Sequence, residues 1–358
     1  MAGNNQHFIP QFLQRGFASH KQGKTAYTWE FRSNGNPLNE PIKDVGAEWQ
    51  FYTEPNDTIV DDKITHAENQ FGNLANRLKA CQAGPVSEPT IPQFIAHLEV
   101  RTRHLRRAFL DSSNYIATRL LNLIADTDTF VSLIQRRMAN DSQWLRSLFI
   151  EEIKKQTNLP RDLNAHVNKC MKSAGTMIPI LLELQKPAIA EAVALLKVQL
   201  PSRFEKAIKS GHLRALKQPI NPEARSDQFM SLHFRVIETS GVNLILGDSA
   251  VLFRIDDSRP FRPYTEKNNK VRAVFLPLTP NRLLIGEQET TDWDCMAIKR
   301  QAARCSLEYF IAHENTPENN NLKNEIGTDA ALLTEAELED LALESFRQIE
   351  KPKGNSPD

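Results

Sequence analysis

The amino-acid sequence predicts an α+β protein in which a helix-rich N-terminal two-thirds precedes a C-terminal antiparallel β-meander and closing helices. Two observations predict this class. From about residue 58, apolar residues such as Ile64, Phe71 and Leu78 recur at helical spacing. From about residue 228, short β-branched and aromatic runs alternate with turn residues instead. Helices and strands are therefore expected in separate parts of the chain.

These patterns divide the chain into stretches of different character. Turn residues dominate residues 1–57, which are expected to be irregular apart from a strand-like run from Lys24 to Phe31. Residues 58–226 are predicted to be helical, and residues 227–350 to hold the sheet and the closing helices. Residues 351–358 are predicted to form a flexible tail. Together these stretches are expected to form one compact unit.

Individual elements follow from the same periodicities. The long helices are expected over residues 112–138, 142–157, 161–185 and 187–209. The meander strands are expected over residues 234–239, 243–246, 250–255, 271–276 and 283–285. The predicted closing helices run from about Met296 to His313 and from Thr334 to Gln348. Thr334 and Glu337 have the spacing of a capping box.

Charge and cysteine content narrow the class of protein. The 358 residues include 44 Lys and Arg and 44 Asp and Glu, so there is no net charge to attract nucleic acid or membranes. The four cysteines are scattered and form no Cys-x-x-Cys pair, which favours free thiols in a reducing compartment. No signal peptide or membrane-spanning stretch is visible. A cytoplasmic protein without membrane contact is expected.

The most distinctive stretch runs from His7 to Phe17, with the sequence HFIPQFLQRGF. Pro10 suits the first turn of a short helix, on which Gln11 and Arg15 share one face. With His7 just before that turn, the three polar side chains favour either anion binding or proton transfer. The structural alternative is that His7 donates to a backbone carbonyl and fixes the entry of a docking helix.

Two further places carry candidate chemistry. Arg101 and Arg103 lie in a basic stretch and are candidates for binding phosphate, although a solvated face on which Arg103 pairs with Glu99 is the alternative. Asp248 lies in a turn between two strand-like runs, where it is either a catalytic carboxylate or a residue that bonds turn backbone. The histidines and cysteines show no metal-ligand spacing. No metal site or cofactor is predicted, and a divalent ion is left open.

These segments resemble the bacterial "domain of unknown function 4238" family, whose members begin with a His-x-(Val/Ile)-Pro-x-x-x-Leu-x-x-Phe pattern. Three later segments support the resemblance in family order: Phe94 to His97 leading into Arg101-Thr102, Leu246 to Ser249, and the Phe275 to Pro280 run FLPLTP. The family has no settled activity. Its relatives are associated with antiphage defence, so the resemblance implies a defence role without a mechanism.

Two functions are weighed from these residues. In the first, the protein is a nuclease or other phosphodiesterase acting on RNA or another nucleic acid. His7 and Asp248 are its catalytic residues, and Gln11, Arg15, Arg101 and Arg103 bind the substrate. In the second, the same residues form a non-catalytic sensor or binding module for a phosphorylated ligand or phage component. Nucleic acid or nucleotide is the expected partner in the first case, and the sequence does not indicate an oligomeric state.

Overall fold

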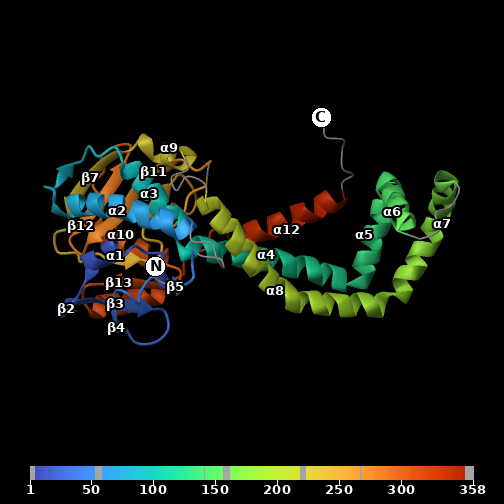
Figure 1. Cartoon of the computed structure of the whole chain (residues 1–358), viewed down its shortest axis with the longest axis horizontal. Helices are drawn as coiled ribbons and strands as arrows, with labels where there is room; N and C mark the ends of the chain where they lie inside the picture. The colour runs from blue at the N-terminus through green and yellow to red at the C-terminus, as the bar shows by residue number, and fades with distance from the viewer. Residues whose placement is uncertain are drawn as a thin grey trace. The chain divides into compact units, whose positions relative to one another are not determined.

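A computed structural model describes residues 5–52, 59–140, 142–155, 162–217, 223–266 and 268–350. The structure divides into two compact units, where the sequence predicts one. The first unit comprises residues 1–109 and 208–332, and the second comprises residues 110–207 and 333–358. The chain passes between the units three times. The first two passages lie inside continuous helices, α4 (Arg103–Ala125) and α8 (Lys186–Lys217), and the third lies between residues 332 and 333 (Figure 1). Helical periodicity continues through a boundary inside a helix, which is why the pattern of apolar residues does not reveal it.

The N-terminal part of the first unit is more regular than the sequence predicts. After β1 (Asn5–His7), a short helix α1 (Gln11–Gln14) continues as a 3-10 turn, η1 (Arg15–Phe17). Further strands follow: β2 (His20–Gln22), β3 (Thr25–Arg32), β4 (Leu38–Pro41) and β5 (Ala47–Trp49). The predicted strand-like run corresponds to β3. The other strands have three or four residues each, too few for a clear alternating pattern, and β1 and β5 pair with each other across about 40 positions.

The larger sheet is antiparallel and has the order β10-β9-β11-β12-β7-β6. Its strands are β6 (Gly84–Pro85), β7 (His233–Glu238), β9 (Leu252–Ile255), β10 (Phe261–Arg262), β11 (Val271–Thr279) and β12 (Arg282–Glu287). The fold class predicted from the sequence is confirmed here, with antiparallel strands toward the C-terminus. The helices α2 (Ile59–Ala80), α3 (Ile91–Val100) and α9 (Glu223–Met230) belong to the same unit.

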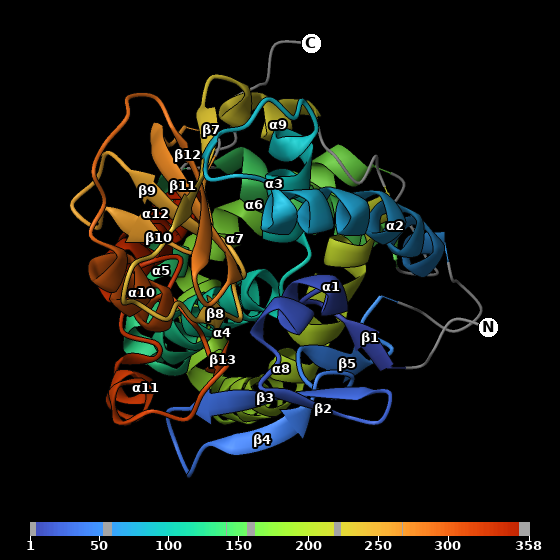
Figure 2. The ribbon, with the colours of Figure 1, turned by 90° about the vertical axis from the view of Figure 1, so that its left-hand side faces the viewer.

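A second antiparallel sheet joins the two ends of the unit, in the order β2-β3-β13-β8, with β4 paired to β3. Its C-terminal strands are β8 (Leu246–Gly247) and β13 (Tyr309–Ala312). The sequence predicts one helix over Met296 to His313, and that prediction is wrong in its second half. Helix α10 (Cys295–Arg304) ends before β13, whose residues pair with Trp29 to Arg32 of β3. In both views of the ribbon, α1 is drawn below α2 and above the strands β3 and β13 (Figures 1 and 2).

The core of the first unit incorporates the N-terminal signature. Phe8, Ile9, Leu13 and Phe17 are at most 2% exposed and belong to the same cluster as the apolar faces of α2, α3 and the larger sheet. Burying one such side chain contributes about 1.5–3 kcal/mol. The apolar side chains of the signature therefore fix the N-terminal segment to the core, and its polar side chains are presented from this fixed segment.

Gly16 touches the backbone of β11, which carries the FLPLTP run. A Cβ atom at Gly16 would lie 2.2 Å from the carbonyl oxygen of Leu278. We expect Gly16→Ala to lower the free energy of unfolding by about 1–3 kcal/mol, because backbone must shift to admit the methyl group. Chemical denaturation measures this change. The control is Gly72→Ala on α2, whose Cβ would meet Phe12 at an ordinary 3.5 Å. Equal losses in the two variants would contradict the close approach.

The second unit is helical in its described part. It contains the distal part of α4, the proximal part of α8, and the helices α5 (Thr127–Asn140), α6 (Ser142–Lys154), α7 (Leu163–Leu184) and α12 (Glu335–Glu350). Helices α5, α6 and α7 contact one another, and α12 contacts α5. The capping box predicted for α12 is present: the Thr334 N–H donates to Glu337 Oε2 at 2.6 Å, and the Glu337 N–H donates to Thr334 Oγ1 at 3.2 Å. Two short helical elements, α11 (Pro317–Leu322) and η2 (Lys323–Glu325), close the first unit. The predicted tail, residues 351–358, lies outside the described residues.

Candidate functional site

The N-terminal signature folds around one buried amide. Pro10 precedes α1 in extended geometry (φ −57°, ψ 134°), as expected before a helix that starts at Gln11. Gln14 is fully buried, and its amide nitrogen donates to the carbonyl oxygens of Ile9 at 2.8 Å and Val45 at 3.0 Å. These two bonds hold the turn against the segment before β5. His7 pairs with Ala47 of β5, so its backbone is fixed by the same part of the structure.

His7 lies half-buried at the edge of this turn. Its Nε2 is 3.0 Å from the carbonyl oxygen of Lys43, the kind of contact that the structural interpretation of the signature predicts. A carbonyl oxygen only accepts, so Nε2 carries the proton and Nδ1 keeps its lone pair. Burial lowers the pKa of His7 below its usual value, and the opposing effect of Glu68 is smaller. At neutral pH the ring is therefore an uncharged proton acceptor.

Arg101 is buried and fully engaged. Its guanidinium binds the carboxylate of Glu68 at 2.7 Å, the Tyr52 hydroxyl at 3.2 Å and His97 Nε2 at 3.1 Å, and it also donates to the backbone carbonyl of His7. Arg101 is 1% exposed. We call Arg101, Glu68, Tyr52 and His97 the Arg101 cluster. Because its charge and donors are matched internally, these contacts give Arg101 a positioning role rather than the predicted role in binding substrate.

Arg103 points to a different set of partners. As the first residue of α4 it binds the carboxylates of Glu308 at 2.9 Å and Glu48 at 3.4 Å, and its side chain is 39% exposed. The two arginines predicted to act together therefore belong to separate networks. The half-exposed Arg103 is ion-paired as the alternative predicts, but the predicted partner is wrong: Glu99 is buried and binds Arg225 instead.

Asp248 is buried beneath the start of β13. Its carboxylate accepts hydrogen bonds from the backbone N–H groups of Leu307 at 2.8 Å, Glu308 at 2.7 Å and Tyr309 at 3.3 Å. Burial raises the pKa of Asp248 to about 6, against the lowering effect of these three bonds. The residue bonds backbone, as in the turn alternative, but it does so across 59 to 61 positions of sequence. This geometry explains Asp248 as a residue that fixes the β8–β13 pairing and leaves it out of the solvent-exposed site.

The predicted site residues thus form two groups. His7, Gln11 and Arg15 lie together at the surface with Arg101 buried beneath them, and the Arg15 guanidinium donates to Gln11 Oε1 at 3.0 Å. Arg103 and Asp248 lie on either side of Glu308, one binding its carboxylate and the other its backbone amide. Only the first group presents several polar side chains at the surface.

Lys79 joins this surface group and is a residue that the sequence reasoning missed. It extends from the last turn of α2 and donates to the carbonyl oxygen of Phe12 at 2.5 Å. Burial, with the nearby positive charge of Arg15, lowers the pKa of Lys79 to about 8. Among the described residues, no carboxylate lies within 4.0 Å of Arg15 or Lys79. Nothing in the local sequence indicates this pairing, because it depends on the packing of α1 against α2.

We call His7, Gln11, Arg15 and Lys79 the signature strip. It offers one neutral proton acceptor, one amide and two cations. A metal centre has no support in the part of the chain that the structure describes, because no group of three or more His, Cys, Asp or Glu side chains is arranged to hold an ion there. Helices long and apolar enough to cross a membrane are likewise not found among the described residues.

The fold and this strip define an α+β protein in which a short N-terminal helix packs into the core above the buried Arg101 cluster, and in which a second unit is helical. The chain belongs to the family described as "Protein of unknown function (DUF4238)", whose model matches residues 5–300. The match covers the signature strip and all the predicted site residues. No curated protein and no solved structure shows significant similarity to the chain.

Proposed function

We propose that the signature strip binds the phosphate group of a ligand and that the protein acts as a binding or sensor module. The observation that carries this proposal is the Arg15–Lys79 pair. Two neighbouring cations with no carboxylate within 4.0 Å among the described residues raise each other's energy. The pKa of Lys79 is lowered first by burial and then by this repulsion from Arg15. A bound anion removes the repulsion and is therefore attracted to this position.

The hydrogen-bonding groups of the pair suit a phosphate. The Lys79 ammonium has three donors, of which the carbonyl of Phe12 takes one. Arg15 is exposed, and among the described residues its guanidinium donates one side-chain hydrogen bond, to Gln11, so its planar fork retains donors for phosphate oxygens. Backbone bonds hold His7 beside them. The strip is therefore built before a ligand arrives, which limits the entropy lost on binding.

The class of ligand remains that of the sequence-based hypotheses: RNA, another nucleic acid, a nucleotide or a phosphorylated phage component. A role in antiphage defence is part of this proposal and rests on the resemblance of the family pattern. All four cysteines are free, which supports the proposed cytoplasmic location, since reducing compartments keep thiols unpaired.

Methyl phosphate is the simplest probe of this site, because it carries the phosphate without a base. We expect it to bind the wild type, and Lys79→Gln and Arg15→Gln each to weaken binding about tenfold, the loss of one charge-assisted hydrogen bond. The measurement is a titration followed by nuclear magnetic resonance. The matched control is Arg77→Gln, also on α2, where the arginine is already paired with Glu88 at 2.9 Å. Unchanged affinity in both strip variants would reject the site.

A second candidate function, cleavage of phosphodiesters in RNA or another nucleic acid, is favoured by the state of His7. In the neutral imidazole, Nδ1 keeps a lone pair that the Gln11 amide nitrogen approaches only at 3.5 Å. This atom can take the proton of an attacking hydroxyl, while Arg15 and Lys79 stabilise the charge on the phosphorane. Asp248 has no part in this version, since it bonds buried backbone. Incubation with total RNA and DNA tests it, with His7→Ala beside the wild type. Absence of cleavage, or cleavage that His7→Ala leaves unchanged, would retire the enzyme and leave the binding module.

A further inference from the structure

A row of amide side chains on α2 borders the signature strip. Asn69, Asn73 and Asn76 are exposed and lie three or four residues apart, so they share one face of the helix. Gly72, where Phe12 of α1 packs against α2, comes three residues after Asn69 and four before Asn76. The three asparagines, which we call the amide row, therefore lie next to the line along which α1 contacts α2.

The amide row has no evident role in folding. None of its three side chains makes a hydrogen bond to another residue in the described part of the chain. Asparagine is a weaker helix former than lysine, glutamine or glutamate, because its short amide competes for backbone hydrogen bonds. Packing does not decide the residue type at exposed positions, so three asparagines weaken α2 without a return in stability. This pattern indicates a role in binding.

The ammonium group of Lys79 lies close to the row. A long side chain on a helix lies back over the turn that precedes it. The bond from Lys79 to the carbonyl oxygen of Phe12 agrees with this direction, because Phe12 packs on Gly72, seven residues earlier. Asn76 belongs to that preceding turn, and side chains three residues apart have Cβ atoms about 5–6 Å from each other. A phosphate held by Arg15 and Lys79 therefore has the amide row as its neighbour.

Asn73 and Asn76 suit two adjacent hydroxyl groups. They are three residues apart on one face, so their amides can converge on neighbouring atoms of a ligand. Each amide both donates and accepts hydrogen bonds, as a hydroxyl group does. The row carries no charge, so it favours the sugar of a ligand over a second anionic group.

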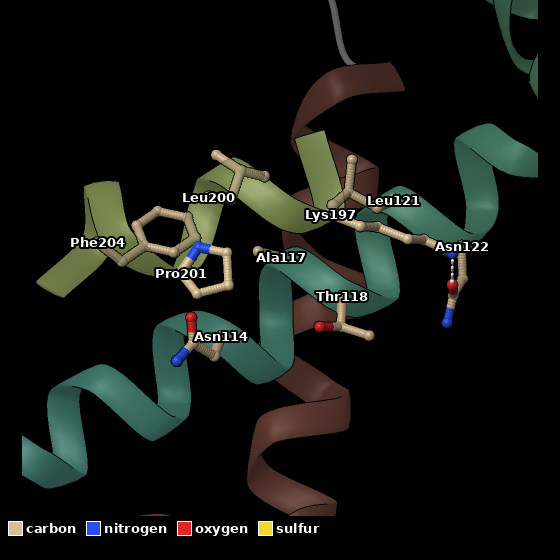
Figure 3. Close-up of a pocket in the computed structure, with 9 residues that line it drawn as sticks. All are labelled: Asn114, Ala117, Thr118, Leu121, Asn122, Lys197, Leu200, Pro201 and Phe204. Atoms are coloured by element: carbon tan, nitrogen blue, oxygen red, sulfur yellow. Dashed lines mark hydrogen bonds between the residues drawn. The ribbon is translucent and has the colours of Figure 1, made fainter. Parts of the chain in front are cut away.

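A groove in the second unit does not offer the same groups. It lies between α4 and α8 and has a volume of about 220 Å³ (Figure 3). Lys197 is the one charged side chain among the residues that line it, and its ammonium already donates to Asn122 Oδ1 at 2.8 Å. At the signature strip, by contrast, two cations adjoin each other with no carboxylate within 4.0 Å among the described residues. A phosphate ester is therefore expected at the strip and not in this groove.

We propose that the signature strip and the amide row together bind a phosphate ester of ribose. The phosphate contacts Arg15 and Lys79, and the two adjacent hydroxyl groups of the sugar bond to Asn73 and Asn76. This inference rests on the phosphate site proposed above and adds the sugar to it. Free sugar phosphates and ribonucleotides share this chemistry.

Titrations followed by nuclear magnetic resonance compare methyl phosphate with methyl ribofuranoside 5-phosphate, whose closed ring does not react with lysine. We expect the sugar phosphate to bind about tenfold more tightly, through two added hydrogen bonds. The double variant Asn73→Ala/Asn76→Ala should bind both ligands as the wild type binds methyl phosphate. Alanine is the better helix former, so α2 is retained. The matched control is Gln70→Ala, exposed on α2 but two residues from Gly72 and so turned away from α1.

Uridine 5′-monophosphate distinguishes the two sources of this chemistry, because its sugar carries a base. Affinity equal to that of the methyl ribofuranoside assigns the site to ribonucleotides, whereas binding about tenfold weaker assigns it to free sugar phosphates.

Equal wild-type affinities for methyl phosphate and the sugar phosphate would overturn the role of the amide row and leave the phosphate site intact. Sugar phosphate binding that the double variant leaves unchanged would do the same. Absence of binding by either ligand would instead reject the signature strip itself. Loss of sugar phosphate binding in Lys197→Gln would place the ligand in the groove of the second unit and also contradict the inference.

Discussion

Replacing Arg101 with alanine will lower the free energy of unfolding of the first unit by about 3–5 kcal/mol, the cost of breaking a buried ion pair from one side. The side chain is 1% exposed and binds Glu68 at 2.7 Å. Its removal leaves Glu68, Tyr52 and His97 without their common donor. It also frees the backbone carbonyl of His7, so the signature strip is expected to lose its position. Urea unfolding followed by circular dichroism measures the change.

Arg103→Ala is the control for this prediction. Arg103 also binds two carboxylates, but its side chain is 39% exposed, and exposed pairs contribute about 0–1 kcal/mol. A loss for Arg103→Ala as large as that for Arg101→Ala would mean that the difference in burial does not decide the roles of the two arginines.

Acid will destabilise the first unit between pH 6.5 and pH 4 through its buried histidines. Burial lowers the pKa of His104 and of His212 from 6.5 to about 4, and lowers that of His97 well below 6.5. A histidine whose pKa is lower in the folded state than in the unfolded state makes its full contribution to stability above the unfolded-state pKa. That contribution is lost as the pH falls through the folded-state pKa. A shift of this size corresponds to about 3 kcal/mol for each of His104 and His212.

Asp248 acts in the opposite direction. Its pKa is raised from 3.8 to about 6, so the stability it contributes is present below pH 3.8 and is lost as the pH rises through 6. Burial also raises the pKa values of Glu30, Asp61 and Glu99, which act in the same direction as Asp248, while the lowered pKa of His7 adds to the effect of the other histidines. The two large histidine shifts, at His104 and His212, outweigh the one large carboxyl shift, at Asp248. We therefore expect a net loss of stability on acidification, measured as urea midpoints from pH 7 to pH 4.

His104→Leu isolates one histidine from this sum. His104 is 2% exposed beside Ala330, and neither ring nitrogen makes a hydrogen bond of ordinary geometry to any described residue. Leucine should therefore cost little at pH 7 and reduce the loss between pH 7 and pH 4 by about 3 kcal/mol. His66→Leu, at an exposed position of α2, serves as the control. A pH profile for His104→Leu parallel to that of the wild type would show that this ring does not drive acid unfolding.

The sequence predicts the fold class because helices and strands differ in period and lie in separate stretches. It misses what depends on distant partners. The run that continues the α10 pattern becomes β13 because β3 and β8 pair with it, as Phe310 does with Phe31 and Gly247. The sequence also does not predict the division into two units, because α4 and α8 continue from one unit into the other without a break in helical periodicity.

For the candidate site, spacing correctly groups Gln11 with Arg15, four residues apart on α1, and places His7 beside them. Spacing does not predict burial. Arg101 and Arg103 lie two residues apart in the same basic stretch. Arg101 is buried and binds Glu68, whereas Arg103 binds Glu308 at the surface. Lys79 is absent from the sequence-based site because only the packing of α1 on α2 brings it to Arg15.

The most direct test of the proposed phosphate site is the pH dependence of methyl phosphate binding to the wild type and to Lys79→Arg. The pKa of Lys79 is lowered to about 8 in the free protein, so its charge decreases above that pH, whereas arginine stays charged. Above pH 8 the ligand remains a dianion, since its second pKa is about 6. We predict that wild-type affinity falls by up to about tenfold per pH unit from about pH 8, the pKa of Lys79 in the free protein, up to the higher pKa that this lysine has when phosphate is bound, while Lys79→Arg binds with a flat profile. Parallel profiles, or wild-type affinity that stays constant up to pH 10, would contradict a phosphate held by Lys79.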